Sequence, residues 1–134
     1  MGTETSEGFC GVRSMSLKIR AIRNAGDLDK ERIVLIADSE VDIGKYVLLA
    51  VDASGEELYS EIGAAFWLPD KEIRGGDLVV VYTKQGNNGV KRNKDNTRTY
   101  FYYWGLKDVN WIPGERAAVL GELRRWNTHF VEEE

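Results

Sequence analysis

The chain has 134 residues, of which 43% are hydrophobic and 30% charged, and this composition excludes a disordered or fibrous protein. The length provides enough apolar residues for the core of one domain. The formal net charge is −4, so the molecule as a whole does not attract nucleic acid or anionic lipid, which leaves only a local basic patch for such binding. The single cysteine, Cys10, cannot form an internal disulfide.

The N-terminal 15 residues are polar and contain glycine, and we interpret them as a flexible leader with the composition of an expression tag. One domain is expected over residues 16–131, followed by a short acidic end at 132–134. The sequence contains neither a signal-peptide pattern nor an apolar stretch long enough to span a membrane. This favours a cytoplasmic location, an inference that holds only if residues 1–14 belong to the natural chain.

Short apolar runs separated by turn residues predict an all-β domain. Their spacing is typical of a β-sandwich, and the apolar residues of 78–81 and 100–104 are expected to face each other across its two sheets. Residues 56–65 are predicted to hold one helical turn at most. Strands are predicted at residues 17–22, 32–37, 46–51, 78–83, 99–104, 116–120 and 123–130.

Four motifs follow one another along the chain. They are Glu31-Arg32 before the apolar run 33–36, Tyr46 before the apolar run 47–51, the segment Phe66-Trp-Leu-Pro69 followed by Ile73, Gly75-Gly76 and Leu78-Val-Val-Val81, and Trp111 followed by Gly114 and the apolar run 117–120. In this order they resemble the lamin tail domain, an immunoglobulin-like fold of nuclear lamins and of many bacterial proteins. The resemblance spans residues 31–123 and implies an immunoglobulin-like β-sandwich of about seven to nine strands, from a bacterial protein. It departs from the family at Ala37-Asp38, where the family usually has asparagine, and in a more basic insert between residues 82 and 99.

The sequence provides few residues for catalysis or for a metal site. His129 is the only histidine and Cys10 lies in the leader, so the chain lacks the partners for a Ser-His-Asp, Cys-His or zinc site. Asp38, Glu40 and Asp42 alternate, as calcium ligands do, but the glycine and the distal glutamate of a calcium loop are missing. We therefore expect no enzyme activity, no cofactor and no metal.

Residues 84–98 form the most distinctive segment, with a net charge of +4 against −8 for the rest of the chain. Glycine and asparagine in this segment predict a long, flexible hairpin loop between the strands at 78–83 and 99–104. Such a loop could bind phosphates, an acidic protein surface or the acidic face of a second copy, or it could simply be solvated and protect the hairpin from edge pairing. Its candidate binding residues are Lys84, Lys91, Arg92, Lys94 and Arg98.

The leading hypothesis is a non-catalytic interaction or targeting module that binds a protein partner or a second copy of itself. The alternative is nucleic-acid binding, in which loop 84–98 contacts the phosphate backbone. A weaker alternative is carbohydrate or cell-surface binding through exposed tryptophan. The resemblance assigns Trp111 and Phe66 to the core, which leaves Trp104 and Trp126 for such a role.

Overall fold

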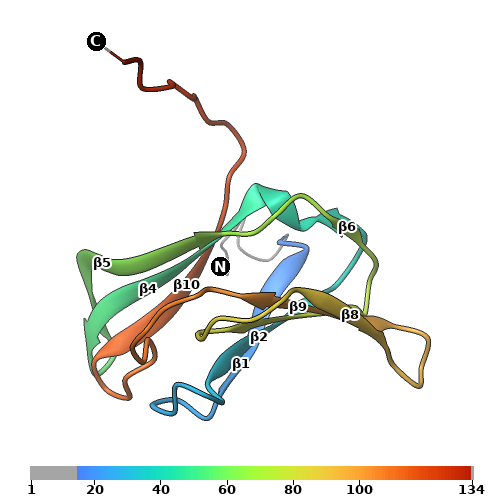
Figure 1. The fold of residues 1–134 in the computed structure, drawn as a ribbon, viewed down its shortest axis with the longest axis horizontal. Coiled ribbons are helices and arrows are strands. Elements are labelled where there is room, and N and C mark those ends of the chain that lie inside the picture. The colour runs from blue at the N-terminus through green and yellow to red at the C-terminus, as the bar shows by residue number, and fades with distance from the viewer. Residues whose placement is uncertain (1–14, 134) are drawn as a thin grey trace, which may run out of the picture.

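The structure, a computed structural model, describes residues 15–133 and confirms the all-β prediction (Figure 1). These residues form ten strands and one short 3-10 turn, η2 (Ile43–Lys45), with no α-helix among them. Two of the strands, β3 and β6, are only two residues long. The strands are β1 (Leu17–Arg23), β2 (Arg32–Ala37), β3 (Val41–Asp42), β4 (Tyr46–Ser54), β5 (Glu57–Trp67), β6 (Glu72–Ile73), β7 (Leu78–Tyr82), β8 (Gly89–Arg92), β9 (Arg98–Tyr103) and β10 (Arg116–Glu122).

Two sheets pack face to face as a β-sandwich (Figure 1). The larger sheet has the strand order β1-β2-β7-β9-β8, the smaller has the order β10-β4-β5, and β3 pairs with β6 alone. All neighbouring strands are antiparallel except β7 and β9, which are parallel. The sequence predicted a hairpin, and hence an antiparallel pair, between the strands at 78–83 and 99–104, so the parallel pair differs from that prediction.

Alternation along the strands gives each sheet one buried face. In β2, for example, Ile33, Leu35 and Ala37 are buried, whereas the residues between them are half-exposed. Each fully buried large apolar side chain stabilises the fold by about 1.5–3 kcal/mol. Trp111 is buried and Phe66 packs against the core, as expected. The buried core consists of Leu17, Ile33, Leu35, Ala37, Ile43, Tyr46, Leu48, Ala50, Leu68, Ile73, Val79, Val81, Tyr100, Tyr102 and Trp111.

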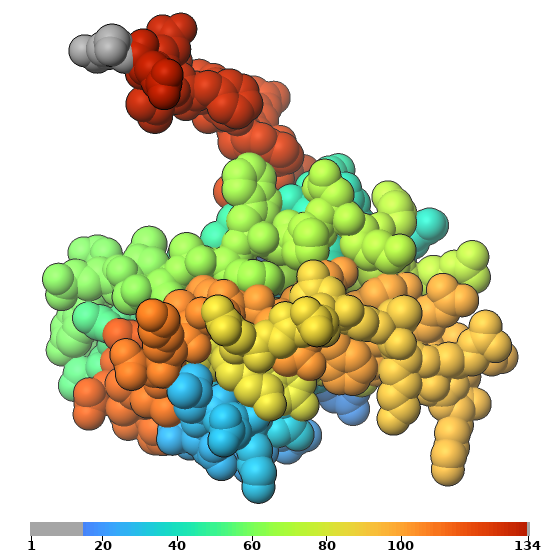
Figure 2. All heavy atoms as spheres, in the orientation of Figure 1, coloured from blue at the N-terminus to red at the C-terminus, as the bar shows by residue number. Residues whose placement is uncertain are grey.

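Two sequence predictions at the smaller sheet were wrong. Residues 57–65 of the predicted helical segment 56–65 belong to β5, which pairs with β4. Register shifts on both sides of Val51, together with Gly63, obscure the strand pattern in the sequence. Residues 123–130 form no strand. The reason is that Glu122 at the end of β10 already pairs with Tyr46, the first residue of β4, so no neighbouring strand remains. The chain instead leaves the sandwich as an extended arm (Figures 1 and 2).

The prediction for residues 84–98 was also wrong in part. Because β7 and β9 are parallel, the segment between them crosses over rather than turning back as one hairpin loop, and it contains β8, which pairs antiparallel with β9. Val79 and Tyr100 are neighbours within one sheet and do not face each other across the sandwich. Both point into the core, which the smaller sheet covers with residues such as Leu48.

The buried carboxylate of Glu31 joins three separate segments at one end of the larger sheet. Its oxygens accept hydrogen bonds from the Gly26 amide at 2.9 Å, the Thr83 hydroxyl at 2.6 Å and the Asn110 amide at 2.7 Å. A longer bond of 3.3 Å comes from the Trp111 amide. Hydrogen bonds to a charged group are about twice as strong as neutral ones, so this group fixes the β1–β2 loop, the chain after β7 and the segment before β10.

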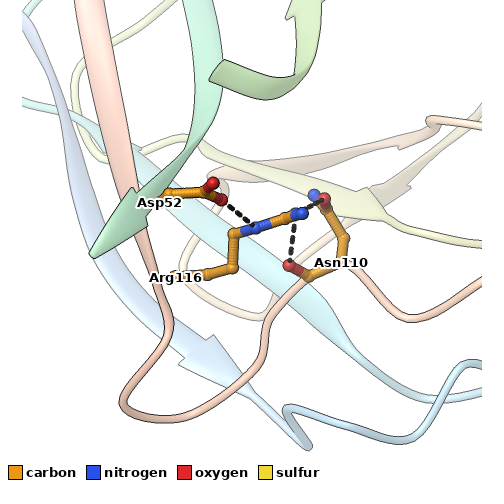
Figure 3. A network of polar contacts seen from close by, with 3 residues as sticks. All are labelled: Asp52, Asn110 and Arg116. Atoms are coloured by element: carbon orange, nitrogen blue, oxygen red, sulfur yellow. Dashed lines mark hydrogen bonds and ion pairs between the residues drawn. The ribbon is translucent and has the colours of Figure 1, made fainter. Parts of the chain in front are cut away.

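Arg116 of β10 joins the segment before β10, through Asn110, to β4 of the smaller sheet (Figure 3). Its Nε donates to Asp52 Oδ1 at 2.9 Å, and one terminal nitrogen donates to the backbone and side-chain oxygens of Asn110 at 3.3 Å each. The guanidinium lies so close to Gly63 that a Cβ there would be 2.7 Å from it. A side chain at position 63 would therefore displace the guanidinium from its place in this network.

Candidate binding face

The two sheets differ in charge. The strands of the smaller sheet contain four acidic residues, Asp52, Glu57, Glu61 and Glu122, and a single basic one, Arg116. The strands of the larger sheet contain no acidic residue at all. They contain seven basic ones: Lys18, Arg20, Arg23, Arg32, Lys91, Arg92 and Arg98. The small net charge of the chain therefore conceals a separation of charge between its two layers.

The side of the larger sheet that points away from the core is called here the outer face. Directly paired residues of neighbouring strands share a face, so the strand registers define three rows across it. Apolar side chains occupy the centre of these rows, and cations stand mainly at the β1 and β8 ends. The rows are Arg23, Arg32, Tyr82 and Tyr103; then Ala21, Val34, Val80, Phe101 and Gly89; then Lys18, Ile36, Leu78, Thr99 and Lys91.

An open depression lies over this face. Three arginines border it, no carboxylate does, and its floor is apolar. The side chains of Val34, Leu78, Tyr82 and Phe101 are partly exposed there, whereas Val80 and Thr99 are only 7% and 6% exposed. The combination fits a ligand that presents apolar and anionic groups together. The lining residues are Arg20, Arg23, Arg32, Val34, Leu78, Val80, Tyr82, Thr99 and Phe101.

Two stacked tyrosines position some of these cations. The rings of Tyr82 and Tyr103 lie 5.3 Å apart with an interplanar angle of 12°. Arg32 and Lys84 both place their cationic ends over the Tyr82 ring, at 5.8 and 5.4 Å from its centroid. Each such contact contributes about 0.5–1 kcal/mol at an exposed site. The chain at Gly86 passes over Tyr103, so neither ring is free to stack on a nucleobase.

The structure brings together four of the five site residues predicted from sequence. Lys91, Arg92, Lys94 and Arg98 lie at the β8–β9 hairpin, at the right of Figure 1. Lys91 pairs with Thr99 and so belongs to the outer face. Arg92 pairs with Arg98 on the opposite side of the sheet, an arrangement of like charges that is destabilising without an anionic partner.

Lys84 lies apart from that group. The start of β9 is level with Asp77, whose Oδ1 accepts from the Arg98 amide at 2.9 Å. Lys84 follows Asp77 by seven residues along the parallel strand β7, which is about 23 Å at the usual rise per residue. It therefore belongs with Tyr82 at the other end of the outer face.

Hydrogen bonds order the turn at the tip of the hairpin, which the sequence predicted to be flexible. The amide and hydroxyl of Thr97 donate to Asp95 Oδ1 at 3.1 and 2.5 Å, and Asn93 Nδ2 donates to the hydroxyls of Thr97 and Thr99 at 3.0 Å each. Asn96 adopts a φ of 71°, which asparagine tolerates better than most residues. The hairpin thus presents its cations from a defined backbone.

The hydrogen bonds from the side chain and amide of Thr97 hold the pKa of Asp95 below its ordinary value of 3.8. Because the folded pKa is the lower one, the turn is fully stabilised above pH 3.8 and loses this contribution as the pH falls below it. We expect an NMR titration of the Asp95 carboxyl to give a midpoint below 3.8, and the Thr97→Val variant to move that midpoint upward. An unchanged midpoint in Thr97→Val would contradict this assignment.

The sequence reasoning missed Arg20, Arg23 and Arg32. They lie in two strands that are separated by a loop, so they form no run in the sequence. One signal was available, because the predicted strands at 17–22, 32–37, 78–83 and 99–104 contain no aspartate or glutamate.

The other candidates from the sequence take ordinary structural roles. Asp42 Oδ1 accepts from the amides of Gly44 and Lys71, and Asp38 pairs with Lys18 at 2.6 Å. Over residues 15–133, no group of three Cys, His, Asp or Glu side chains could hold a metal ion. Within the same range, no helix is long and apolar enough to cross a membrane. Cys10 lies outside the described residues.

The tryptophans provide no flat platform for a sugar. Trp67 and Trp126 are both about half-exposed, but their rings meet edge to face at 5.5 Å and 89°. Trp104 is partly buried and packs against Phe66 and Trp111 at the core. A sugar ring needs an accessible aromatic face, so this geometry does not favour carbohydrate binding.

Comparison with protein families, with curated proteins and with solved structures finds no match to this chain. The outer face and its charges are therefore interpreted on their chemistry alone.

Proposed function

We propose that this protein is a non-catalytic binding module that binds an acidic polypeptide segment with apolar side chains on its outer face. The observation that carries the proposal is a sheet face with an apolar floor at its centre, five of the seven strand cations around it and no acidic residue in its strands. These five cations are Lys18, Arg20, Arg23, Arg32 and Lys91. Charge directs such a segment to the face, and burial of its apolar side chains against Val34, Leu78 and Phe101 then supplies affinity.

The same features favour a polypeptide over nucleic acid as the ligand of this face. Nucleic-acid interfaces are polar, and single strands bind by stacking bases on free aromatic rings. Here the floor is formed by the aliphatic side chains Val34, Leu78 and Val80 together with one phenylalanine, Phe101. Cations and Gly86 cover the tyrosine pair. An acidic segment with leucine, valine or phenylalanine matches both the rim and the floor.

We also propose that the domain is related to the lamin tail domain. The order of its four motifs supports this, as do the buried positions of Glu31, Tyr46 and Trp111 within them. The relationship would make this chain an immunoglobulin-like interaction domain, in agreement with a binding role. Sandwich folds serve many functions, so the choice of ligand rests on the outer face and not on the fold.

A fluorescence anisotropy titration tests the proposal, with a fluorescein-labelled decapeptide that alternates leucine and glutamate as the probe. We expect saturable binding that the Arg20→Glu/Arg23→Glu variant weakens by about tenfold or more, because both side chains border the depression. Both residues are exposed on the edge strand β1, so their replacement leaves the core intact.

The matched control is Lys45→Glu/Lys107→Glu, which makes the same change in net charge at two exposed positions off the outer face. It should retain nearly the wild-type affinity. Absence of binding by the wild-type protein at a concentration where it is monomeric, or equal losses in the two double variants, would show that the outer face is not the binding surface.

A second candidate function is phosphate-backbone binding at the β8–β9 hairpin, which the cross-strand pair of Arg92 and Arg98 favours because an anion would relieve their repulsion. We expect a gel shift of a DNA duplex at about 50 mM salt that disappears when Lys91, Arg92 and Lys94 are replaced with alanine. A shift that survives this triple replacement would exclude the hairpin as the site.

A further inference from the structure

We infer that a ligand of the outer face is the C-terminal arm of a second copy of this chain, so that two copies exchange arms. The arm is residues 123–134. This inference rests on the proposed function, since it names one occupant for the same face.

The arm has the physical character of a segment that lacks its partner. It leaves the end of β10, and after the Leu123 amide donates to the Lys45 carbonyl at 2.7 Å, residues 124–133 make no backbone hydrogen bond to any other described residue. Figure 2 shows the arm standing clear of the sandwich. Phe130 and Val131 on it are 82% and 96% exposed, although both are residue types that proteins usually bury.

The last five residues of the arm match the outer face in composition, whereas Arg124 and Arg125 lie at its base. The apolar pair Phe130-Val131 is followed directly by three glutamates, Glu132–Glu134. On the outer face, an apolar floor is bordered directly by the arginines of β1 and β2. Residues 130–134 therefore offer an apolar and an anionic part to a surface with an apolar and a cationic part.

The dimensions agree as well. Three strand spacings separate β9, which carries Phe101, from β1, which carries Arg20 and Arg23, and this is about 14 Å. The four residue steps from Phe130 to Glu134 cover about 13 Å in an extended chain. An arm laid across the strands can thus place its phenylalanine on the floor and its glutamates beside the arginines at the same time.

The contact is between copies because the arm starts on the opposite layer of the sandwich. It follows β10 of the smaller sheet, and the contact of Trp126 with Trp67 of β5 fixes its base on that side. From there it projects away from its own outer face (Figure 1). Two copies related by a two-fold axis would each place an arm on the other, as closed symmetric dimers do.

A charge-swap experiment on the full chain tests this inference by analytical ultracentrifugation at about 100 mM salt. We expect the wild-type protein to show a concentration-dependent doubling of mass that weakens as salt is raised. The arm variant Glu132→Lys/Glu133→Lys/Glu134→Lys and the face variant Arg20→Glu/Arg23→Glu should each weaken self-association about tenfold or more.

Mixing those two variants should restore the double-mass species, because each arm then meets a face of opposite charge. The control Lys45→Glu/Lys107→Glu should associate as the wild type does. A wild-type protein that stays monomeric, or association that persists in the face variant alone, overturns the inference.

The decapeptide titration separates this inference from the proposed function. A monomeric wild type that still binds the decapeptide at the outer face would refute arm exchange and leave the binding module standing. A monomeric wild type that binds no decapeptide would refute both.

Discussion

Replacing Glu31 with glutamine is expected to lower the free energy of unfolding by about 3 kcal/mol or more, which is about 10 °C in Tm for a domain of this size. The carboxylate is fully buried, and its two oxygens accept from Gly26, Thr83, Asn110 and Trp111. Glutamine keeps the shape but replaces one acceptor oxygen with an NH₂ group that faces other donors. Thermal and urea unfolding of the full chain measure the loss.

The matched control for this prediction is Glu56→Gln, in the exposed turn between β4 and β5, which should change the free energy of unfolding by less than about 0.5 kcal/mol. If Glu31→Gln and Glu56→Gln unfold at the same temperature, the three segments are not held together through Glu31.

Replacing Trp111 with alanine is expected to cost about 3–5 kcal/mol, since it removes a large side chain that is 2% exposed and packs at one end of the core. The loss is one of packing, because the indole Nε1 makes no hydrogen bond to a described residue. The backbone amide that donates to Glu31 is retained in the variant. Urea unfolding gives the change in free energy.

Trp126→Ala serves as the comparison. This side chain is 52% exposed on the arm and loses one edge-to-face contact with Trp67, so its removal should cost no more than about 1 kcal/mol. Equal costs for the two tryptophans would mean that Trp111 does not contribute to the core as described.

The sequence sufficed for the strands whose apolar pattern is uninterrupted. The stretch 32–37 alternates between buried and half-exposed positions and matches β2. Within the predicted strand 78–83, residues 78–82 form β7, whose three central valines are all buried. β5 escaped prediction because it is an edge strand with mostly exposed residues and a glycine that accommodates Arg116. The alternation of apolar and polar residues cannot reveal such a strand, because β5 is held by its pairing with β4 and not by burial of one of its own faces.

The candidate site likewise contains residues that the sequence identified and residues that it missed. The sequence identified the cations of the hairpin because they are close along the chain, and it missed Arg20, Arg23 and Arg32 because only the strand order β1-β2-β7-β9-β8 brings them to one face. The parallel pairing of β7 with β9 decides that order, and it depends on a crossover that residue spacing does not encode. The cationic surface therefore arises from the order of the strands in the sheet and not from a run of basic residues in the sequence.

A methyl NMR titration of the full chain with the leucine–glutamate decapeptide tests binding at the outer face directly. We expect the methyl signals of the outer-face floor, Val34, Leu78 and Val80, to shift on binding. Those of Leu49 and Val119, paired on the exposed side of the smaller sheet, should not move. Shifts at Leu49 and Val119 with an unchanged floor would contradict the claim that the outer face of the larger sheet is the binding surface.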